Sequence, residues 1–472
     1  MTRGTHQPAV AVVGGGITGL VAAHRLLSDP QPPRVVVYES ASELGGKIRS
    51  AHLGGCDIEL GPDGFVGRNS PLLPLCHDLG LGDDVVAARA GAVEVWSRGR
   101  LRRLPAGLIM GMPVRLGPVL RSRLLSTREL LRAGFDFVLP PTRCDTDLSI
   151  AALIGGRMGR GVVDRLVDPL LGGVYAGSVD FLGADAALPG LRERLSGRRS
   201  LIRVLRQMGA RPATAQLVTV RGGLGRLVDA LAADVRRRGG QVHTGTAVAT
   251  LAAVPDGWQI TTRSGQIESV DAVVLAAPAG AAAELLRSSQ RGIATDLGLI
   301  PYAAVTVASF VYPRNAFAQP PAGNGILVPR IEGTLLRACT WVTSKWPHQA
   351  RDDVVIARCS TGSYGDNRHA DLSDEALGRA LHRELSAAAG LRGEPLHTRV
   401  TRWHDALPQY RVGHRVNVAA WRARLPATLT LAGAAYDGVG LTACATQGRD
   451  AAEQILAHLS EKTTSMPIAG RT

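Results

Sequence analysis

The hydrophobic pattern at the start of the chain predicts a strand buried in a parallel sheet. Residues 9–13 form a short, uninterrupted apolar run rich in valine, which is typical of a strand covered on both faces. A glycine-rich turn, an apolar helix at 20–27 and a second apolar strand at 34–38 follow, and that strand leads into Glu39. This order of strand, turn, helix, strand and acid predicts a Rossmann-like, dinucleotide-binding unit.

The glycines of the turn are candidate cofactor ligands. Gly14 would make the tight turn, Gly16 would let the backbone approach a pyrophosphate, and Gly19 would let the helix pack closely. The start of the helix offers free amides and the positive end of its dipole to phosphate. Glu39 is placed to accept both ribose hydroxyls and would repel a 2′-phosphate, so NADP is disfavoured, while the motif itself leaves FAD and NAD open. The first set of candidate residues is Gly14, Gly15, Gly16, Ile17, Thr18, Gly19, Glu39 and Ser40.

The rest of the pattern divides the chain into alternating segments. Residues 96–211 are basic, punctuated by proline and typical of helices, whereas 286–420 contains several β-rich runs. Apolar runs at 241–248 and 271–278 return to the nucleotide sheet. We therefore expect an α/β fold with a discontinuous nucleotide-binding domain, a helical insertion, and a second domain built on a mixed sheet. The expected segments are 1–90, 211–285 and 425–472 for the nucleotide domain, 91–210 for the insertion, and 286–424 for the substrate domain.

Composition and charge narrow the classes of function. At 472 residues, with 45% hydrophobic and 20% charged content, the chain is globular and long enough for two or three domains. The 54 basic and 40 acidic residues give a net charge of +14, which suits an anionic ligand or simply an arginine-rich solvated surface. We expect no nucleic-acid partner. The cysteines show no metal-ligand spacing, so we expect no metal, and reduced thiols in a cytoplasmic protein without a secretory signal or a spanning helix.

A basic, apolar segment admits three interpretations. Residues 104–113 are largely apolar, and five arginines follow them. Such a segment can lie on an anionic membrane surface, cover a ligand channel, or form ordinary helices with one solvated face. We favour ordinary helices and keep peripheral contact with the inner face of a membrane as an alternative. The arginines are Arg115, Arg121, Arg123, Arg128 and Arg132.

Further glycine-rich motifs lie beyond the first one, and together they carry a family resemblance. The sequences GGGITG at 14–19, LGGKIRS at 44–50 and ELGPDGF at 59–65 resemble the flavin amine oxidase superfamily. The GPDG turn and the segment DPLLGGVYAG at 168–177 are similar to its porphyrinogen oxidase branch. A strand and loop at 429–441, which lead into a helix reaching about His458, resemble the flavin-closing motif of the family, so the resemblance covers most of the chain. We expect the polar tail from Glu461 to be disordered.

The resemblance implies non-covalent FAD and further site residues. A helix N-terminus at the closing motif would place free amides near the flavin N1 and C2 carbonyl and stabilise the negative charge of reduced flavin. The dense glycine and alanine of 173–177 would let the backbone approach a flat ligand. The implied cofactor residues are Lys47, Gly61, Pro62, Asp63, Gly64, Val248 through its backbone, Trp403, Val439, Gly440 and Leu441. The implied substrate wall is Gly173, Val174, Tyr175, Ala176 and Gly177, together with the segment at 403–410 that crosses near the flavin ring.

The resemblance also implies a reaction in heme biosynthesis. Members of the branch remove six electrons from a porphyrinogen in three flavin cycles and return them to O2 as H2O2. Because the cofactor carries this chemistry, no catalytic side chain is identified. Coproporphyrinogen III has four propionates and suits this basic chain better than protoporphyrinogen IX, which has two. The arginine-rich chain also resembles the Gram-positive branch that acts on the first, alongside partner enzymes of the heme pathway.

Two other classes of protein stay open. Another flavin oxidoreductase, such as an amine oxidase or a carotenoid desaturase, would share the nucleotide motifs. An amine oxidase usually carries paired aromatics at the closing motif, where this chain has Tyr436 alone. A non-catalytic binding protein on the same fold would lack a full flavin fingerprint, whereas this chain keeps every element.

Overall fold

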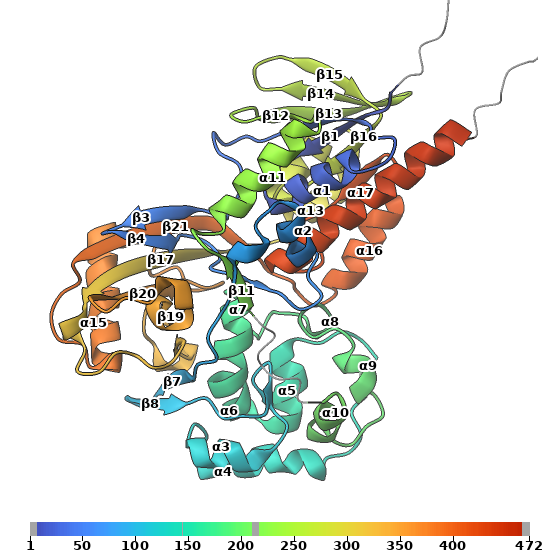
Figure 1. Cartoon of the computed structure of the whole chain (residues 1–472). Helices are drawn as coiled ribbons and strands as arrows, with labels where there is room; N and C mark the ends of the chain where they lie inside the picture. The colour runs from blue at the N-terminus through green and yellow to red at the C-terminus, as the bar shows by residue number, and fades with distance from the viewer. Residues whose placement is uncertain (1–6, 144, 210–216, 465–472) are drawn as a thin grey trace, which may run out of the picture.

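A five-stranded parallel sheet lies at one end of the molecule in the computed structural model, which describes residues 7–143, 145–209 and 217–464 (Figure 1). Its strand order is β12-β2-β1-β16-β22, so the first strand of the chain is central. All five residues of β1 are buried, as the apolar run predicts. The strands are β1 (Ala9–Val13), β2 (Arg34–Tyr38), β12 (Gln241–His243), β16 (Ala272–Leu275) and β22 (Leu429–Leu431).

Both faces of this sheet are covered. On one face lie α1 (Ile17–Leu27), α11 (Gly225–Arg237) and α17 (Leu441–Thr464). A Cβ at Gly448 of α17 would lie 2.2 Å from the Thr18 carbonyl oxygen, so the two helices touch backbone to backbone. On the other face lie an antiparallel sheet of β13 (Val248–Val254), β14 (Gly257–Thr262) and β15 (Ile267–Val270), and the helices α12 (Ala279–Leu286) and α13 (Arg291–Gly298).

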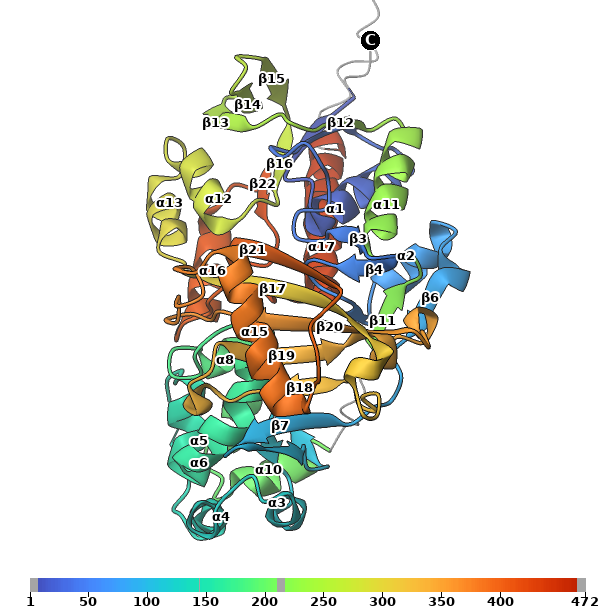
Figure 2. The same ribbon diagram turned by 90° about the vertical axis from the view of Figure 1, so that its left-hand side faces the viewer.

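A seven-stranded mixed sheet forms the second layer, with α15 (Asp374–Ala389) across it (Figure 2). Neighbouring strands are antiparallel except β18 and β7, which run parallel. In spatial order the strands are β21 (His397–Pro408), β17 (Tyr302–Pro313), β20 (Val354–Thr361), β19 (Leu336–Trp341), β18 (Gly325–Leu327), β7 (Val93–Ser97) and β8 (Arg100–Arg103).

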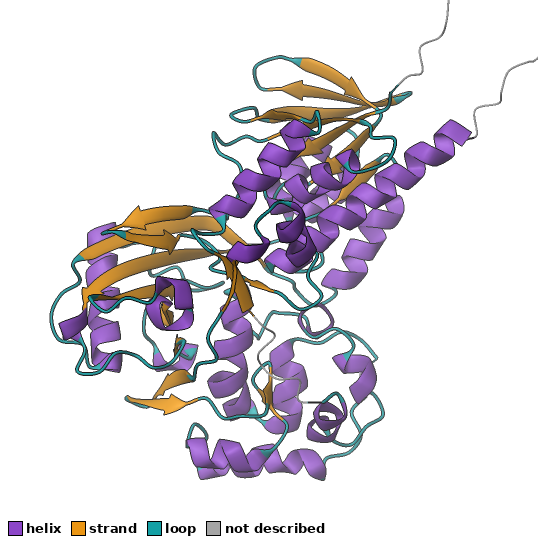
Figure 3. Ribbon diagram, in the orientation of Figure 1, coloured by secondary structure: helices purple, strands orange, loops and turns teal. Residues whose placement is uncertain are grey.

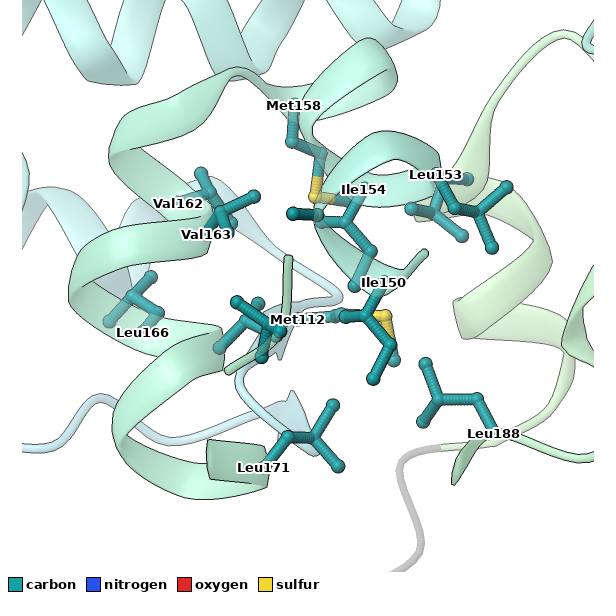
Figure 4. Close-up of a cluster of buried hydrophobic side chains, with 14 of the residues drawn as sticks. Met112, Ile150, Leu153, Ile154, Met158, Val162, Val163, Leu166, Leu171 and Leu188 are labelled. Carbon is teal, nitrogen blue, oxygen red and sulfur yellow. The ribbon is translucent and has the colours of Figure 1, made fainter. Parts of the chain in front are cut away.

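Helices gather at the far end of the molecule, around one hydrophobic cluster (Figures 3 and 4). A ten-residue π-helix, η3 (Val163–Gly172), packs there against α5 (Ile150–Met158), with Met112 between them. The other helices of this part are α3 (Leu116–Ser122), α4 (Thr127–Gly134), η2 (Phe135–Phe137), α6 (Arg160–Val162), α7 (Gly173–Tyr175), α8 (Ala184–Ala187), α9 (Leu191–Leu195) and α10 (Leu201–Gln207).

Shorter elements connect these layers. The strands are β3 (Ser50–Leu53), β4 (Cys56–Glu59), β5 (Phe65–Val66), β6 (Val85–Ala87), β9 (Leu108–Ile109), β10 (Met112–Pro113) and β11 (Leu217–Val220). The helices are α2 (Leu72–Asp78), η1 (Gly82–Asp84), η4 (Arg314–Ala316), η5 (Arg330–Glu332), α14 (Val342–Lys345), η6 (Pro347–Gln349) and α16 (His414–Arg424).

The expected α/β class, with a nucleotide sheet assembled from distant segments, is confirmed. The expected boundaries between domains stay predictions. β7 and β8 differ from the expectation for 91–210, because they form a hairpin that extends the mixed sheet through β18. The run at 241–248 also divides: β12 joins the parallel sheet, and β13 begins a separate one at Val248.

The C-terminal helix is longer than we expected. The sequence indicated a helix end near His458 and a disordered tail from Glu461, but α17 continues to Thr464. The remainder of the predicted tail lies outside the described residues. Within the part of the chain that the structure describes, no helix combines the length and apolar character needed to cross a bilayer.

Candidate functional site

The glycine turn fixes how α1 leaves the central strand. Gly14 has φ +116°, and its N–H donates to the Tyr38 carbonyl at 2.8 Å. A Cβ at Gly19 would lie 1.9 Å from the Gly14 carbonyl oxygen. Only glycine at position 19 lets the helix start so close to the turn, as the fingerprint requires.

A second loop lies beside this turn. The Gly45 N–H donates to the Gly15 carbonyl at 2.8 Å, and Gly45 pairs with Gly16 in an isolated parallel bridge. A Cβ at Gly16 would have no heavy atom nearer than 4.0 Å, the Gly46 Cα. The Gly16 backbone at the start of α1 is therefore open, and this open cradle fits a phosphate group.

Glu39 lies at the end of β2, beside the turn. Its Oε2 accepts the Gly15 N–H at 2.8 Å, and its Oε1 accepts the Ala41 N–H at 2.8 Å. The Thr246 N–H donates to the Glu39 carbonyl, which brings the start of β13 at Val248 close to the same acid. The structure thus places Glu39, Ser40 and Val248 at one edge of the glycine turn.

The GPDG turn packs against the loop that carries Lys47. A Cβ at Gly61 would lie 1.9 Å from the Lys47 carbonyl oxygen, so glycine is required there. The Trp403 indole N–H donates to the Leu60 carbonyl at 2.8 Å, which brings β21 to the same turn. Gly64 is similarly confined, since its Cβ would lie 2.7 Å from the Val218 carbonyl oxygen.

The Lys47 ammonium lies in the space between these elements. Its Nζ is 5.5 Å from the centre of the Tyr302 ring. Burial lowers the pKa of Lys47, while Cys444 and Asp405 act in the opposite direction. Lys47 therefore lies near both the start of α17 and the end of β21, where the resemblance places the flavin ring.

Asp63 is a half-buried ion-pair partner. Its Oδ2 is 2.7 Å from the Lys345 Nζ. Burial alone would raise the pKa of Asp63, but Lys345 and Arg358 together hold it below its usual range. Arg358 also donates to the carbonyls of Glu59 and Gly61. In this protein the Asp63 side chain supports the turn from behind, and its predicted cofactor role stays a prediction.

Glu59 is a buried carboxyl with a perturbed pKa. Its Oε1 accepts the Leu224 N–H at 2.6 Å, and its Oε2 accepts the Ser50 hydroxyl at 2.9 Å. Burial raises the pKa of Glu59 to about 7, against these hydrogen bonds and the charge of Arg358. The folded chain consequently binds a proton at Glu59 that the unfolded chain releases near its ordinary value of 4.5.

This raised pKa predicts a pH-dependent stability. Because the folded state favours the neutral carboxyl, stability falls as the pH rises from about 4.5 to about 7 and stays lower above that range. In the Glu59→Gln variant, stability should no longer depend on pH in this way. Its free energy of unfolding should exceed that of the wild type by up to about 3 kcal/mol at pH 8. Thermal unfolding at pH 5 and pH 8, with flavin in excess, measures the difference.

Asp63→Asn is the matched control for that prediction. Asp63 is ionised in both folded and unfolded chains between pH 5 and 8, because its folded pKa is lowered. This variant should lower stability equally at both pH values and keep the wild-type slope. Equal slopes in the wild type and Glu59→Gln would show that Glu59 does not titrate in this range.

The closing loop is held by Gln447, which sequence reasoning did not single out, and by Tyr410, which it placed only at the end of the pocket segment 403–410. Gln447 Oε1 accepts the N–H groups of Gly433 and Asp437 at 3.2 and 3.4 Å. The Tyr410 hydroxyl accepts the Gly438 N–H at 2.9 Å and donates to the Ala434 carbonyl. Burial raises the pKa of Tyr410 far above its usual range, so the phenol keeps the proton that it donates.

The start of α17 follows directly from this loop. α17 begins at Leu441, and the first amides of a helix have no acceptor within the helix, so those of Gly440 and Leu441 are available to a ligand. The predicted role of Val439, which precedes them, stays a prediction. Cys444, one turn further, has its pKa raised to about 11 by burial and stays a neutral thiol. The loop therefore presents a helix N-terminus, and no thiolate, to the predicted ring site.

The predicted substrate wall lies against this loop. Tyr175 meets Tyr410 edge to face at 5.6 Å, and Gln409 donates to the Tyr175 carbonyl at 2.9 Å. Ala176 has φ +43°, and its carbonyl accepts the Tyr364 N–H at 2.7 Å. Tyr410 thus connects the predicted substrate wall to the predicted flavin-closing loop, although the two are far apart in sequence. No motif identified the roles of Gln447 and Tyr364, and the sequence placed Tyr410 in the pocket segment without its link to the closing loop.

Comparison with known proteins agrees with this arrangement. The family model of flavin containing amine oxidoreductases matches residues 17–456. The chain is 34% identical to coproporphyrinogen III oxidase of Propionibacterium freudenreichii, over 97% of this chain and 92% of that protein. It is 31% identical to the Staphylococcus aureus protein of that name, over 96% and 99%. It is 30% identical to human protoporphyrinogen oxidase, over 95% and 98%.

Solved structures show the same fold. A crystal structure described as a putative protoporphyrinogen oxidase from Exiguobacterium matches with a TM-score of 0.85 and 28% identity, over 96% of this chain and 100% of that one. Cyclohexylamine oxidase of Brevibacterium oxydans matches with a TM-score of 0.71 at 18% identity, over 96% and 100%, which is a likeness of fold. The chain belongs to the flavin containing amine oxidoreductase family.

Proposed function

We propose that this chain is an oxidase that converts coproporphyrinogen III to coproporphyrin III, with non-covalent FAD as cofactor and O2 as electron acceptor. The observation that carries the proposal is near-full-length similarity to several bacterial coproporphyrinogen III oxidases, at 30 to 35% identity. The fold supports it, because Tyr410 joins the glycine-rich wall to the flavin-closing loop in one site.

The residues of the chain fit the FAD that the proposal requires. The open Gly16 backbone would hold the pyrophosphate, and Glu39 would accept the ribose hydroxyls. The amides at the start of α17 and the Lys47 ammonium would place positive charge beside the ring system. Bound flavin would supply the acceptor for hydride equivalents from the porphyrinogen and pass the electrons to O2 as H2O2.

The side chains of the protein would then position the substrate and would not act as proton donors or acceptors. Three of the residues 173–177 are small, namely Gly173, Ala176 and Gly177, so the backbone there can approach a flat macrocycle closely. Tyr410 and Gln409 fix that wall relative to the closing loop. Burial keeps Tyr175 and Tyr410 protonated by raising the pKa of each, so neither phenol is a general base near neutral pH.

Protoporphyrinogen IX is the second candidate substrate. The human relative is named protoporphyrinogen oxidase, and the Exiguobacterium protein is described as a putative protoporphyrinogen oxidase. Both match nearly all of this chain. An amine substrate has weaker support, since the amine oxidases share the fold at 16 to 18% identity. Peripheral contact with a membrane and hand-off to heme-pathway enzymes stay predictions from the sequence.

Anaerobic mixing tests the proposal directly. The purified yellow protein should be bleached by coproporphyrinogen III faster than by protoporphyrinogen IX, and air should then restore the flavin spectrum and yield fluorescent porphyrin. Release of the cofactor by denaturation should give free FAD. If neither porphyrinogen bleaches the flavin, the proposal is wrong. If protoporphyrinogen is preferred, the substrate assignment alone is wrong.

A further inference from the structure

An arginine without a carboxylate partner lies at the outer edge of the predicted substrate wall. Arg411 follows Tyr410 directly, and its backbone pairs with Leu182 in an isolated bridge. Its Nη2 donates to the Tyr364 hydroxyl, and its guanidinium lies 5.7 Å from the centre of the Tyr364 ring. Tyr364 is itself attached to the wall, because its N–H donates to the Ala176 carbonyl at 2.7 Å.

Arg411 differs in its partners from two arginines whose carboxylates lie close in sequence to Phe181 and Tyr364. Arg160 pairs with Asp164 and Asp180, and Arg368 pairs with Asp366. For Arg411, the structure shows no ion pair within the described residues, and the side-chain acceptor it contacts is a neutral phenol. An exposed guanidinium with unused donors, stacked on an aromatic ring, is well suited to bind a carboxylate.

The surroundings of Arg411 suit an apolar ligand with acidic ends. Phe181 meets Tyr364 edge to face at 5.9 Å. Val174 of the wall is 49% exposed, Phe181 is 55% exposed, and Val412, next to Arg411, is 47% exposed. Phe181 contacts the ring that Arg411 binds and Val412 adjoins Arg411, and exposed apolar side chains beside a cation indicate a ligand-contacting rim.

A buried polar atom lies on the residue next to Tyr364. Ser363, directly before Tyr364, is 4% exposed, and its hydroxyl has no hydrogen-bond partner among the described residues. Buried polar groups are normally satisfied, so this hydroxyl indicates that a polar ligand atom or a water belongs nearby.

We propose that Arg411, oriented by Tyr364, binds a propionate of the porphyrinogen at the outer edge of the wall. The inference rests on the proposed function and adds to it the residue that recognises an acidic substituent. Arg411 is then a specificity residue, and Tyr364 is a positioning residue that acts through it. Because the interaction is with a peripheral carboxylate, it affects binding and leaves the oxidation itself unchanged.

Fluorescence titration with coproporphyrin III tests the proposal on the flavin-loaded enzyme. Arg411→Gln should raise the Kd for coproporphyrin III about fivefold or more. The Kd for coproporphyrin III tetramethyl ester, measured in detergent, should not change, since the ester has no carboxylate. In turnover with coproporphyrinogen III, KM should rise by a similar factor while kcat stays within about twofold.

Three variants control the experiment. Arg415→Gln removes the same charge from an exposed position four residues away and should leave both Kd values unchanged. Arg411→Lys keeps the charge and should recover part of the loss. Tyr364→Phe keeps the ring, removes the hydroxyl that accepts the Arg411 bond, and should give a smaller loss than Arg411→Gln.

Two results would overturn the assignment. In the first, the Kd of Arg411→Gln for coproporphyrin III stays within twofold of the wild-type value. In the second, Arg411→Gln loses as much affinity for the tetramethyl ester as for the free acid. A wild-type enzyme that neither binds coproporphyrin III nor is bleached by its porphyrinogen would instead refute the proposed function. Equal weakening by Arg415→Gln and Arg411→Gln would show that overall charge attracts the ligand, and would also contradict a specific site.

Discussion

Alanine at Gly16 is expected to abolish tight flavin binding while leaving the fold intact, whereas alanine at Gly19 should damage both. Gly16 has φ −74° and ψ 178°, a conformation that alanine adopts readily, and its added Cβ would meet no heavy atom closer than the Gly46 Cα at 4.0 Å. In the loaded protein that Cβ would stand where the backbone must approach the pyrophosphate. Losing those charge-assisted bonds predicts a roughly tenfold to hundredfold weaker affinity for FAD.

Gly19 is different because its space is filled by the protein itself. The added Cβ would lie 1.9 Å from the Gly14 carbonyl oxygen and 3.1 Å from Val12 Cγ1, both on or beside the central strand. α1 cannot move outward to relieve this clash, since α17 already touches it at Gly448. Overpacking of this kind typically costs about 1–3 kcal/mol and would also displace the phosphate-binding turn.

Two measurements separate the variants. The ratio of flavin absorbance to protein reports cofactor content, and unfolding of the flavin-free protein reports the fold. Gly280→Ala is the control, because a Cβ there meets no atom within 4 Å in the helix α12. It should keep full flavin content and gain about 0.5–1 kcal/mol. A Gly16→Ala protein with wild-type flavin content would exclude Gly16 from the phosphate site.

The nucleotide unit could be predicted because its requirements are local. Gly15 is confined by Glu39 and Gly19 by Gly14, both within the same short unit, and the apolar runs give the strands directly. Gly14 is the exception, because a Cβ there would lie 2.6 Å from the carbonyl oxygen of Ala276, far along the chain. Glu39 could be placed for the same reason, since the end of β2 determines its position next to the turn. The spacing of residues within this short unit was sufficient to predict the position of Glu39.

The ring and substrate sites could not be predicted in this way because their contacts are long-range. Tyr410 unites Tyr175, Ala434 and Gly438, and no spacing in the sequence expresses that convergence. The π-helix η3 was also missed, because its wider turn has no hydrophobic period that distinguishes it from an α-helix over ten residues. The hairpin of β7 and β8 was missed because its partner strand, β18, lies far along the chain.

The second large effect is a loss of stability, and we expect it for Asp136→Ala in the helical part of the molecule. The Asp136 side chain is fully buried, and its carboxylate accepts the Arg157 Nε–H at 2.8 Å and the Ser200 hydroxyl at 2.6 Å. It also accepts the first backbone amides of α10, from Leu201 and Ile202, at 3.0 and 2.9 Å. One carboxylate therefore ties η2, α5 and α10 together.

Removing that carboxylate leaves the buried Arg157 guanidinium without its counter-ion and two helix amides without an acceptor. The expected loss is about 3–5 kcal/mol in the free energy of unfolding, which denaturant titration measures. Asp83→Ala, at an exposed site, should change stability by less than about 0.5 kcal/mol. A loss below about 1 kcal/mol for Asp136→Ala would show that water replaces the carboxylate.

The double variant Asp136→Leu with Arg157→Met separates the two contributions. This variant removes the Arg157 guanidinium as well as the Asp136 carboxylate. The part of the stability loss that comes from an unpaired Arg157 should therefore be recovered. The amides of Leu201 and Ile202 stay without a side-chain acceptor in both variants. Arg157 also donates to the carbonyls of Pro140 and Arg199, and these would lose their donor. Recovery should therefore be partial, and a complete return to wild-type stability would mean that the capping of α10 contributes nothing.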